Sequence, residues 1–118
     1  MAMNTRKIKL AKDETLMTEG EGSSSMYWLQ QGQLSVHKMR GNELVLLGHV
    51  YSGELVGEMS FLDDEPRSAT VKALSDCELV EIPSENFESI MSTQPKWMQI
   101  LIKTLVARLR KANARIRV

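Results

Sequence analysis

The sequence predicts a mainly β fold that ends in helices, because two patterns divide its 118 residues. Between residues 8 and 82, short strand-like runs alternate with turn residues at close intervals, which favours an antiparallel sandwich or barrel of the jelly-roll type. From residue 83 onward, apolar residues recur with helical spacing instead. A chain of this length is expected to bury one core. We therefore expect a single domain over residues 1–118, with a β-roll at 8–82 and C-terminal helices at 83–118.

The strands are predicted from short runs bounded by turn residues. In one of them, Leu34, Val36 and Met39 are apolar, whereas the intervening Ser35 and His37 are polar. Because successive side chains in a strand point to opposite faces, this alternation predicts one buried face. The other elements expected are a weak strand at 9–17 with a turn at 12–14, a loop at 19–24, a strand at 25–30, turns at 31–33 and 40–42, and strands at 43–50, 69–73 and 77–82.

Residues 57–70 have the features of a small anion-binding cassette. Gly57 permits a positive φ or a close backbone approach. Residues 58–62 can form one helical turn whose first N–H groups point at an anion. After turn residues at 63–66, Arg67 offers a planar guanidinium that can bind two phosphate oxygens.

Glu58 adds a second requirement for the ligand. A carboxylate next to a phosphate is repulsive unless it accepts a hydrogen bond from a hydroxyl, which a ribose 2′-OH would supply. Glu58 and Arg67 together therefore predict a ligand with a phosphate and a free 2′-OH. The alternative is a surface turn in which Arg67 pairs with acidic neighbours. These neighbours are Asp63, Asp64 and Glu65.

This stretch resembles the phosphate-binding cassette of the cyclic nucleotide-binding domain family. That family opens the cassette with Gly-Glu-(Leu/Met)-(Ala/Ser) and closes it with Arg-(Ser/Thr/Ala)-Ala, which here correspond to residues 57–60 and 67–69. The resemblance extends over residues 8–116 and includes the sensor domains of catabolite activator proteins and of cAMP-dependent kinase regulatory subunits. It implies the family's antiparallel β-roll, a double-stranded β-helix with C-terminal helices.

The resemblance also implies a cyclic nucleotide ligand and no cofactor. Arg67 would bind the cyclic phosphate, Glu58 the ribose 2′-OH, and Ser68 with the backbone around Ala69 would complete the phosphate cradle. By analogy the Arg-Ser-Ala sequence favours cAMP, but a hydroxyl at Ser68 can also contact a guanine amine, so cGMP stays open. The ligand-binding residues predicted in this way are Gly57, Glu58, Met59, Ser60, Arg67, Ser68, Ala69, Thr70 and Asn113.

Two helices are predicted after the strands. Ser84 is expected to cap a short helix, with Phe87 as its core anchor, that ends near residues 92–94. Pro95 suits the first turn of a longer helix over 95–118. The long helix carries an apolar seam at Met98, Ile102, Leu105, Leu109, Ala112 and Ile116, with spacings of 4, 3, 4, 3 and 4, widened by Trp97, Ile100 and Leu101.

The resemblance assigns two roles to the long helix. In the dimeric catabolite activator proteins the corresponding helix pairs with its twin and closes over the nucleotide base, so a homodimer is expected here. By the same resemblance Asn113 would lie near the base, where its amide could contact the base edge. The alternative for Asn113 is a solvated position on the helix.

Charge is unevenly distributed although the net charge is zero. All fifteen acidic residues lie between Asp13 and Glu88, whereas eleven of the fifteen basic residues lie outside that range. An acidic body argues against a nucleic-acid surface, and the basic last helix is best explained as a solvated face. An acidic body would also repel a free phosphate, so local donors such as Arg67 must provide the affinity for an anion.

Other chemistries lack the residues they need. With His37 and His49 as the only histidines, no metal-ligand spacing is complete, and no catalytic constellation suggests an enzyme. Cys77 is the only cysteine and is predicted to be a buried apolar residue, which together with the lack of a signal peptide or membrane span indicates a cytoplasmic protein.

We therefore expect a regulatory domain that senses cAMP in signal transduction by closing its C-terminal helices on the ligand. Two alternatives stay open. One is a dimerisation or interaction module without a nucleotide. The other is the N-terminal sensor fragment of a transcription regulator, whose helix-turn-helix domain would follow Val118.

Overall fold

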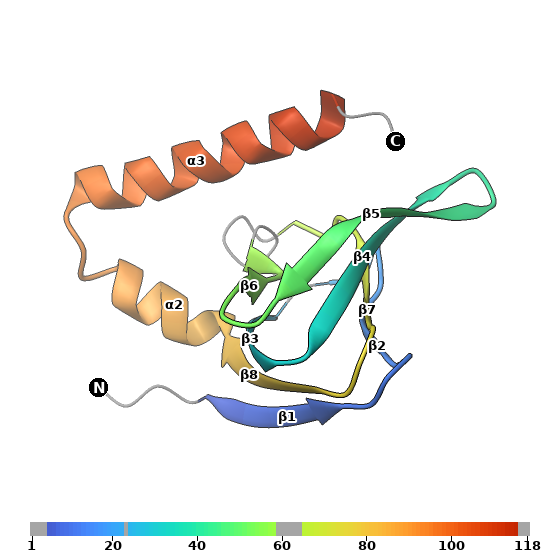
Figure 1. The fold of residues 1–118 in the computed structure, drawn as a ribbon. Coiled ribbons are helices and arrows are strands. Elements are labelled where there is room, and N and C mark those ends of the chain that lie inside the picture. The colour runs from blue at the N-terminus through green and yellow to red at the C-terminus, as the bar shows by residue number, and fades with distance from the viewer. Residues whose placement is uncertain (1–4, 23, 59–64, 116–118) are drawn as a thin grey trace.

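The computed structural model describes residues 5–22, 24–58 and 65–115, which form two antiparallel sheets followed by two helices (Figure 1). The strands are β1 (Arg6–Leu10), β2 (Thr15–Met17), β3 (Ser25–Gln31), β4 (Gln33–Arg40), β5 (Glu43–Tyr51), β6 (Leu55–Val56), β7 (Thr70–Ala73) and β8 (Cys77–Pro83). The helices are α2 (Ser84–Met91) and α3 (Lys96–Arg115). The predicted fold class, an antiparallel β-roll with C-terminal helices, is confirmed.

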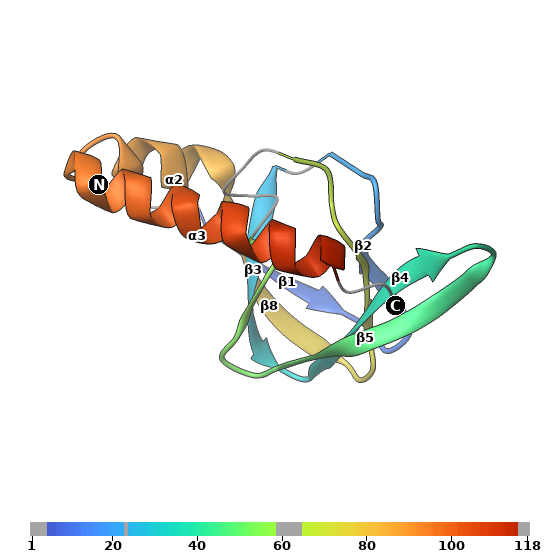
Figure 2. The ribbon, with the colours of Figure 1, turned by 90° about the horizontal axis from the view of Figure 1, so that it is seen from above.

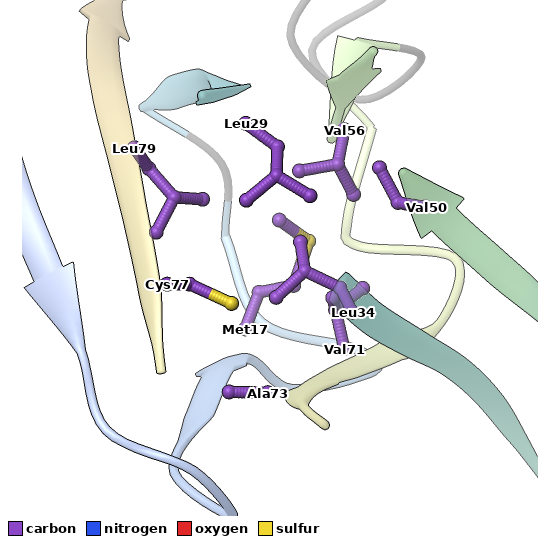
Figure 3. Close-up of a cluster of buried hydrophobic side chains, with 9 residues drawn as sticks. All are labelled: Met17, Leu29, Leu34, Val50, Val56, Val71, Ala73, Cys77 and Leu79. Atoms are coloured by element: carbon purple, nitrogen blue, oxygen red, sulfur yellow. The ribbon is translucent and has the colours of Figure 1, made fainter. Parts of the chain in front are cut away.

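Each sheet has four strands, in the orders β1-β8-β3-β6 and β2-β7-β4-β5. The first strands pair with the last ones, β1 with β8 and β2 with β7, and this closes the roll. Apolar side chains from both sheets meet between them (Figure 3). The buried cluster consists of Met17, Leu29, Leu34, Val50, Val56, Val71, Ala73, Cys77 and Leu79. The prediction that Cys77 is a buried apolar residue is therefore confirmed.

The turn between β3 and β4 requires a glycine. Gly32 has a φ of +97°, and a Cβ at this position would lie 2.5 Å from the carbonyl oxygen of Asp76 and 2.7 Å from the Cys77 Sγ atom. No side chain fits there unless the start of β8 moves. The predicted turn at 31–33 is thus fixed by contact with a distant strand as well as by its own conformation.

The predicted alternation in β4 holds only near the core. Leu34 is fully buried, but Met39 is 48% exposed, so its assignment to the buried face is wrong. Met39 pairs with Leu44 near the turn of the β4–β5 hairpin. This hairpin extends beyond the rest of the roll (Figures 1 and 2). The polar Ser35 is unexpectedly buried because β4 lies between two strands, and its hydroxyl donates to the Lys72 carbonyl on β7 (3.4 Å).

The start of α2 differs from its prediction. The N-cap residue is Pro83, no side chain caps the helix, and Ser84 is the first helical residue, so the assignment of Ser84 as the cap is wrong. The reason is that β8 runs directly into the helix, and the Ser84 N–H donates to the Ser24 carbonyl (2.9 Å). Phe87 is half-buried and lies outside the buried cluster, so it does not anchor that core.

The start of α3 agrees with the predicted role of Pro95. The Pro95 carbonyl accepts the first helical hydrogen bonds, from the Met98 N–H (3.0 Å) and the Gln99 N–H (3.3 Å). Proline lacks an N–H group, so it is well suited to a position where that group would have no helical partner. The turn that ends α2 is also formed near residues 92–94, as predicted.

The apolar seam of α3 is partly buried and partly exposed to solvent. Met98 and Ile102 are half-buried, whereas Leu105 and Leu109 are 49% and 50% exposed. Among α3 residues 96–112, only Val106 is buried, and it is not a seam position. The additional apolar residues predicted to widen the seam, Trp97, Ile100 and Leu101, are all exposed. The last seam position, Ile116, lies outside the described residues.

Candidate ligand-binding site

The centre of the candidate site is Arg67, whose side chain is only 6% exposed. Its Nη1 group donates to the Gly57 carbonyl (3.2 Å) and its Nη2 group to the Ser25 carbonyl (2.7 Å). Arg67 is therefore buried, whereas the alternative placed it in a surface turn, and the Asp63 and Asp64 of that alternative lie outside the described residues. Main-chain oxygens from β3 and from the end of β6 instead fix its guanidinium inside the roll.

Gly57 makes this position of Arg67 possible. Its φ is +81°, and a Cβ there would lie 2.5 Å from the Arg67 Nη1 atom and 3.0 Å from the Met17 Cε atom. An L-residue would therefore be strained by its own backbone and would also displace the arginine. The glycine expected to allow a close approach does so, and the approaching group is the guanidinium.

The backbone of Arg67 is held by the loop between β2 and β3. The Arg67 N–H donates to the Glu21 carbonyl (2.8 Å), and the Arg67 carbonyl accepts from the Gly20 N–H (2.8 Å). Close by, the Thr70 hydroxyl accepts from the Glu19 N–H (3.0 Å). The loop at 19–22 thus belongs to the site, although its sequence shows only turn propensity.

A row of polar contacts continues from Arg67 across the first sheet. The Arg67 Cζ atom lies over the Tyr27 ring, 5.9 Å from its centroid. The Tyr27 hydroxyl donates to Glu81 (3.3 Å), and Glu81 forms an ion pair with Arg6 (2.8 Å). These partners could not be predicted from the sequence, because they depend on the register of β1, β8 and β3.

Burial acts on the pKa of both members of the central pair. It lowers the pKa of the Arg67 guanidinium, while Tyr27 and Glu21 oppose that change. It raises the pKa of the Tyr27 phenol, and the Glu81 carboxylate adds to the rise whereas Arg67 opposes it. At neutral pH Arg67 is charged and Tyr27 is neutral, so the site presents one positive charge over a neutral aromatic ring.

Some of the other predicted ligand residues belong to the described part of the chain and some do not. Glu58 follows Gly57 and is half-buried, as are Ser68 and Ala69. The Ser68 carbonyl accepts from the Lys38 Nζ group (3.5 Å), which adds a basic residue from β4 that the sequence did not single out. Asn113 lies in the last turns of α3. Met59, Ser60 and most of the predicted helical turn at 58–62 lie outside the described residues.

The described residues provide neither a cluster of metal ligands nor a membrane-spanning helix. Among residues 5–22, 24–58 and 65–115, no three histidine, cysteine, aspartate or glutamate side chains gather to hold a metal ion. No helix in this part of the chain is both long and apolar enough to cross a bilayer.

Comparison with known proteins assigns the chain to a family. The model of the cyclic nucleotide-binding domain matches residues 7–94, and the chain therefore belongs to the cyclic nucleotide-binding domain family. The assignment expected from residues 57–60 and 67–69 is confirmed.

Three similar proteins carry this domain in larger chains. Lysophospholipase nte1 of Aspergillus fumigatus is 30% identical over 101 residues, which are 85% of this chain and 7% of that protein. The cAMP-activated global transcriptional regulator CRP of Salmonella typhimurium is 25% identical over 111 residues, covering 92% of this chain and 52% of the regulator. The cAMP-bound form of the EAL enzyme Bd1971 has a TM-score of 0.86 and 29% identity, covering 92% of this chain and 29% of that one. The chain thus spans about half of the regulator and much less of the other two.

Proposed function

We propose that this domain is a regulatory sensor that binds a cyclic nucleotide, with cAMP as its first ligand, and that it performs no catalysis. The observation that carries the proposal is the buried guanidinium of Arg67, fixed to the carbonyl of Gly57 ten residues earlier. A preorganised cation of this kind favours a phosphate, because little ordering remains to be done when the ligand binds. The family assignment and the cAMP-bound form of Bd1971 support the same ligand class.

The remaining roles follow from the chemistry of the cassette. Arg67 binds the cyclic phosphate, Ser68 and the backbone at Ala69 extend the phosphate site, and Glu58 accepts from the ribose 2′-OH. The choice of base is to be measured, since Bd1971 is also known in a cGMP-bound form. The single buried thiol of Cys77 is in keeping with a reducing, cytoplasmic location.

We further propose that the signal is carried by α2 and α3. A ligand shifts a conformational equilibrium only by binding one state more tightly, and here the favoured state would have the helices closed over the base. The exposed apolar residues of α3, including Leu105 and Leu109, suit pairing with the same helix of a second copy. This surface also supports the alternative of an interaction module without nucleotide, which a titration distinguishes.

The test is calorimetric titration with cAMP and then cGMP. Saturable binding of one nucleotide per chain is expected, and Arg67→Ala should weaken it by roughly ten- to a hundredfold through loss of a charge-assisted hydrogen bond. Arg40→Ala is the matched control, because it removes the same charge from an exposed position at the end of β4. Equal affinity of the wild type and Arg67→Ala would reject the phosphate assignment, and no binding at all would favour the interaction module.

A second titration tests Glu58. Glu58→Ala should weaken binding of cAMP more than binding of 2′-deoxy-cAMP, because only cAMP has the hydroxyl that the carboxylate accepts from. The deoxy ligand is the internal control for general damage to the site. If both ligands lose the same factor, Glu58 does not bind the ribose.

A further inference from the structure

We infer that Tyr27 is a positioning residue that orients Arg67 for the ligand phosphate, an inference that rests on the proposed function. Tyr27 is on β3, distant in sequence from the cassette, and has no counterpart among the residues predicted to bind the nucleotide. The guanidinium of Arg67 lies over its ring.

The guanidinium of Arg67 is held by two main-chain carbonyls and lies over an aromatic ring. The carbonyls of Ser25 and Gly57 accept from Nη2 and Nη1, and such bonds hold a planar group mainly within its own plane. The Tyr27 ring lies against the guanidinium, 5.9 Å from Cζ to the ring centroid, a distance at which the ring attracts a cation. The two carbonyls and the ring therefore act together on the position of the guanidinium.

Tyr27 is itself held by strand pairing on both sides. It pairs with Val56 on β6, the residue next to Gly57, and with Glu81 on β8. Glu81 also pairs with Arg6 on β1, so Arg6, Glu81, Tyr27 and Val56 form one row across the four strands of the sheet. Directly opposed side chains share a face, which is why the Tyr27 hydroxyl reaches Glu81 and Glu81 reaches Arg6.

This arrangement differs from ordinary core packing. Tyr27 is half-buried and packs against the core cluster without belonging to it. The Tyr27 hydroxyl donates to Glu81, which is itself paired with Arg6. The ring is therefore held at its hydroxyl as well as at the backbone. A side chain that served only to fill space would need neither the hydroxyl partner nor the cation.

A double-mutant cycle tests the role. Tyr27→Leu should weaken cAMP binding by roughly two- to thirtyfold, the range expected for loss of a cation–π contact. Tyr27→Phe keeps the ring and should recover most of that loss. In an Arg67→Ala background, Tyr27→Leu should change the affinity no further, because the residue through which it acts is gone. Tyr51→Leu on β5 is the control for loss of a tyrosine elsewhere, since that side chain is 55% exposed.

The outcomes separate the inference from the proposed function. Wild-type affinity in Tyr27→Leu, or the same loss with and without Arg67, would overturn the positioning role while leaving cAMP binding intact. Failure of the wild-type chain to bind cAMP or cGMP would overturn both. Thermal unfolding without nucleotide identifies variants that do not fold. If Tyr27→Leu is one of these, Tyr27→Met is used, because its longer side chain fills more of the space without presenting an aromatic face.

Discussion

At the scale of single residues, the site depends on a cation that the fold keeps inside. Desolvation of a charged group is unfavourable unless dipoles or opposite charges compensate. Arg67 donates hydrogen bonds to two carbonyls and lies over an aromatic ring, and a bound phosphate would add an opposite charge. We therefore expect a nucleotide both to be held by Arg67 and to stabilise the folded domain.

Gly57 gives the sharpest prediction at this scale. Gly57→Ala should lower the free energy of unfolding by more than the roughly 1–2 kcal/mol that a positive φ alone imposes on an L-residue, and it should weaken nucleotide binding, because the new Cβ would displace Arg67. Thermal unfolding and titration with cAMP measure the two effects.

Gly41→Ala is the matched control for this substitution. Gly41 also has a positive φ, of +63°, but a Cβ there would meet nothing within 4 Å. It should therefore show the backbone strain without the loss of affinity. If the two variants lose stability equally and both bind normally, the close approach of residue 57 to Arg67 does not matter for nucleotide binding.

The same residues show what a sequence can and cannot predict about the site. Gly57 and Arg67 are only ten residues apart, so one local sequence pattern was enough to predict both, and Arg67 donates to the Gly57 carbonyl. Ser25, Tyr27 and Glu21 were not predicted. They reach Arg67 through the register of β3 and the path of the loop before it, and neither is encoded in a local pattern.

At the scale of elements, α3 shows the limit of apolar periodicity. Its apolar residues cover a stripe that is broader than one contact face, so the pattern predicts an amphipathic helix without showing which edge faces the roll. In the structure Val106 is buried, whereas Leu105 and Leu109 are about half exposed. The boundary of α2 was displaced for a similar reason, since β8 continues to Pro83 and leaves no separate cap.

The exposed side of α3 carries a prediction about assembly. If it pairs with a second copy, Leu105→Asp and Leu109→Asp should shift the chain toward the monomer without lowering the thermal stability of the roll, because both side chains are about half exposed in the single chain. Sedimentation velocity measures the change in oligomeric state.

Lys103→Asp is the control for this experiment. It places the same side chain on α3 but nearly opposite to Leu105 on the helix, given the 3.6 residues of each turn. It should leave the oligomeric state unchanged. An equal shift for Lys103→Asp and Leu105→Asp would show that helix charge, and not the apolar face, controls assembly.

At the scale of the whole molecule, the closure of the roll explains the uneven charge of the sequence. The basic strand β1 lies beside β8, where Arg6 is opposite Glu81 and Lys9 is opposite Glu78. Opposite charges on directly paired residues stabilise a sheet, so the basic start of the chain complements part of the acidic body. The sequence predicted most of the strands and the turns at 31–33 and 40–42, but not the short β6. It did not predict this long-range pairing, because strands far apart in the chain carry no signal of their partner.

The buried position of Cys77 has a practical consequence for following the domain in motion. Its thiol is 3% exposed and donates to the carbonyls of Ser75 (3.2 Å) and Gln33 (3.5 Å), so reagents cannot reach it while the roll is folded. Since it is the only native cysteine, a second one introduced at an exposed position of α3 can be labelled selectively in an otherwise unaltered protein. A fluorophore attached there would test directly whether α3 moves when nucleotide is added, as proposed above.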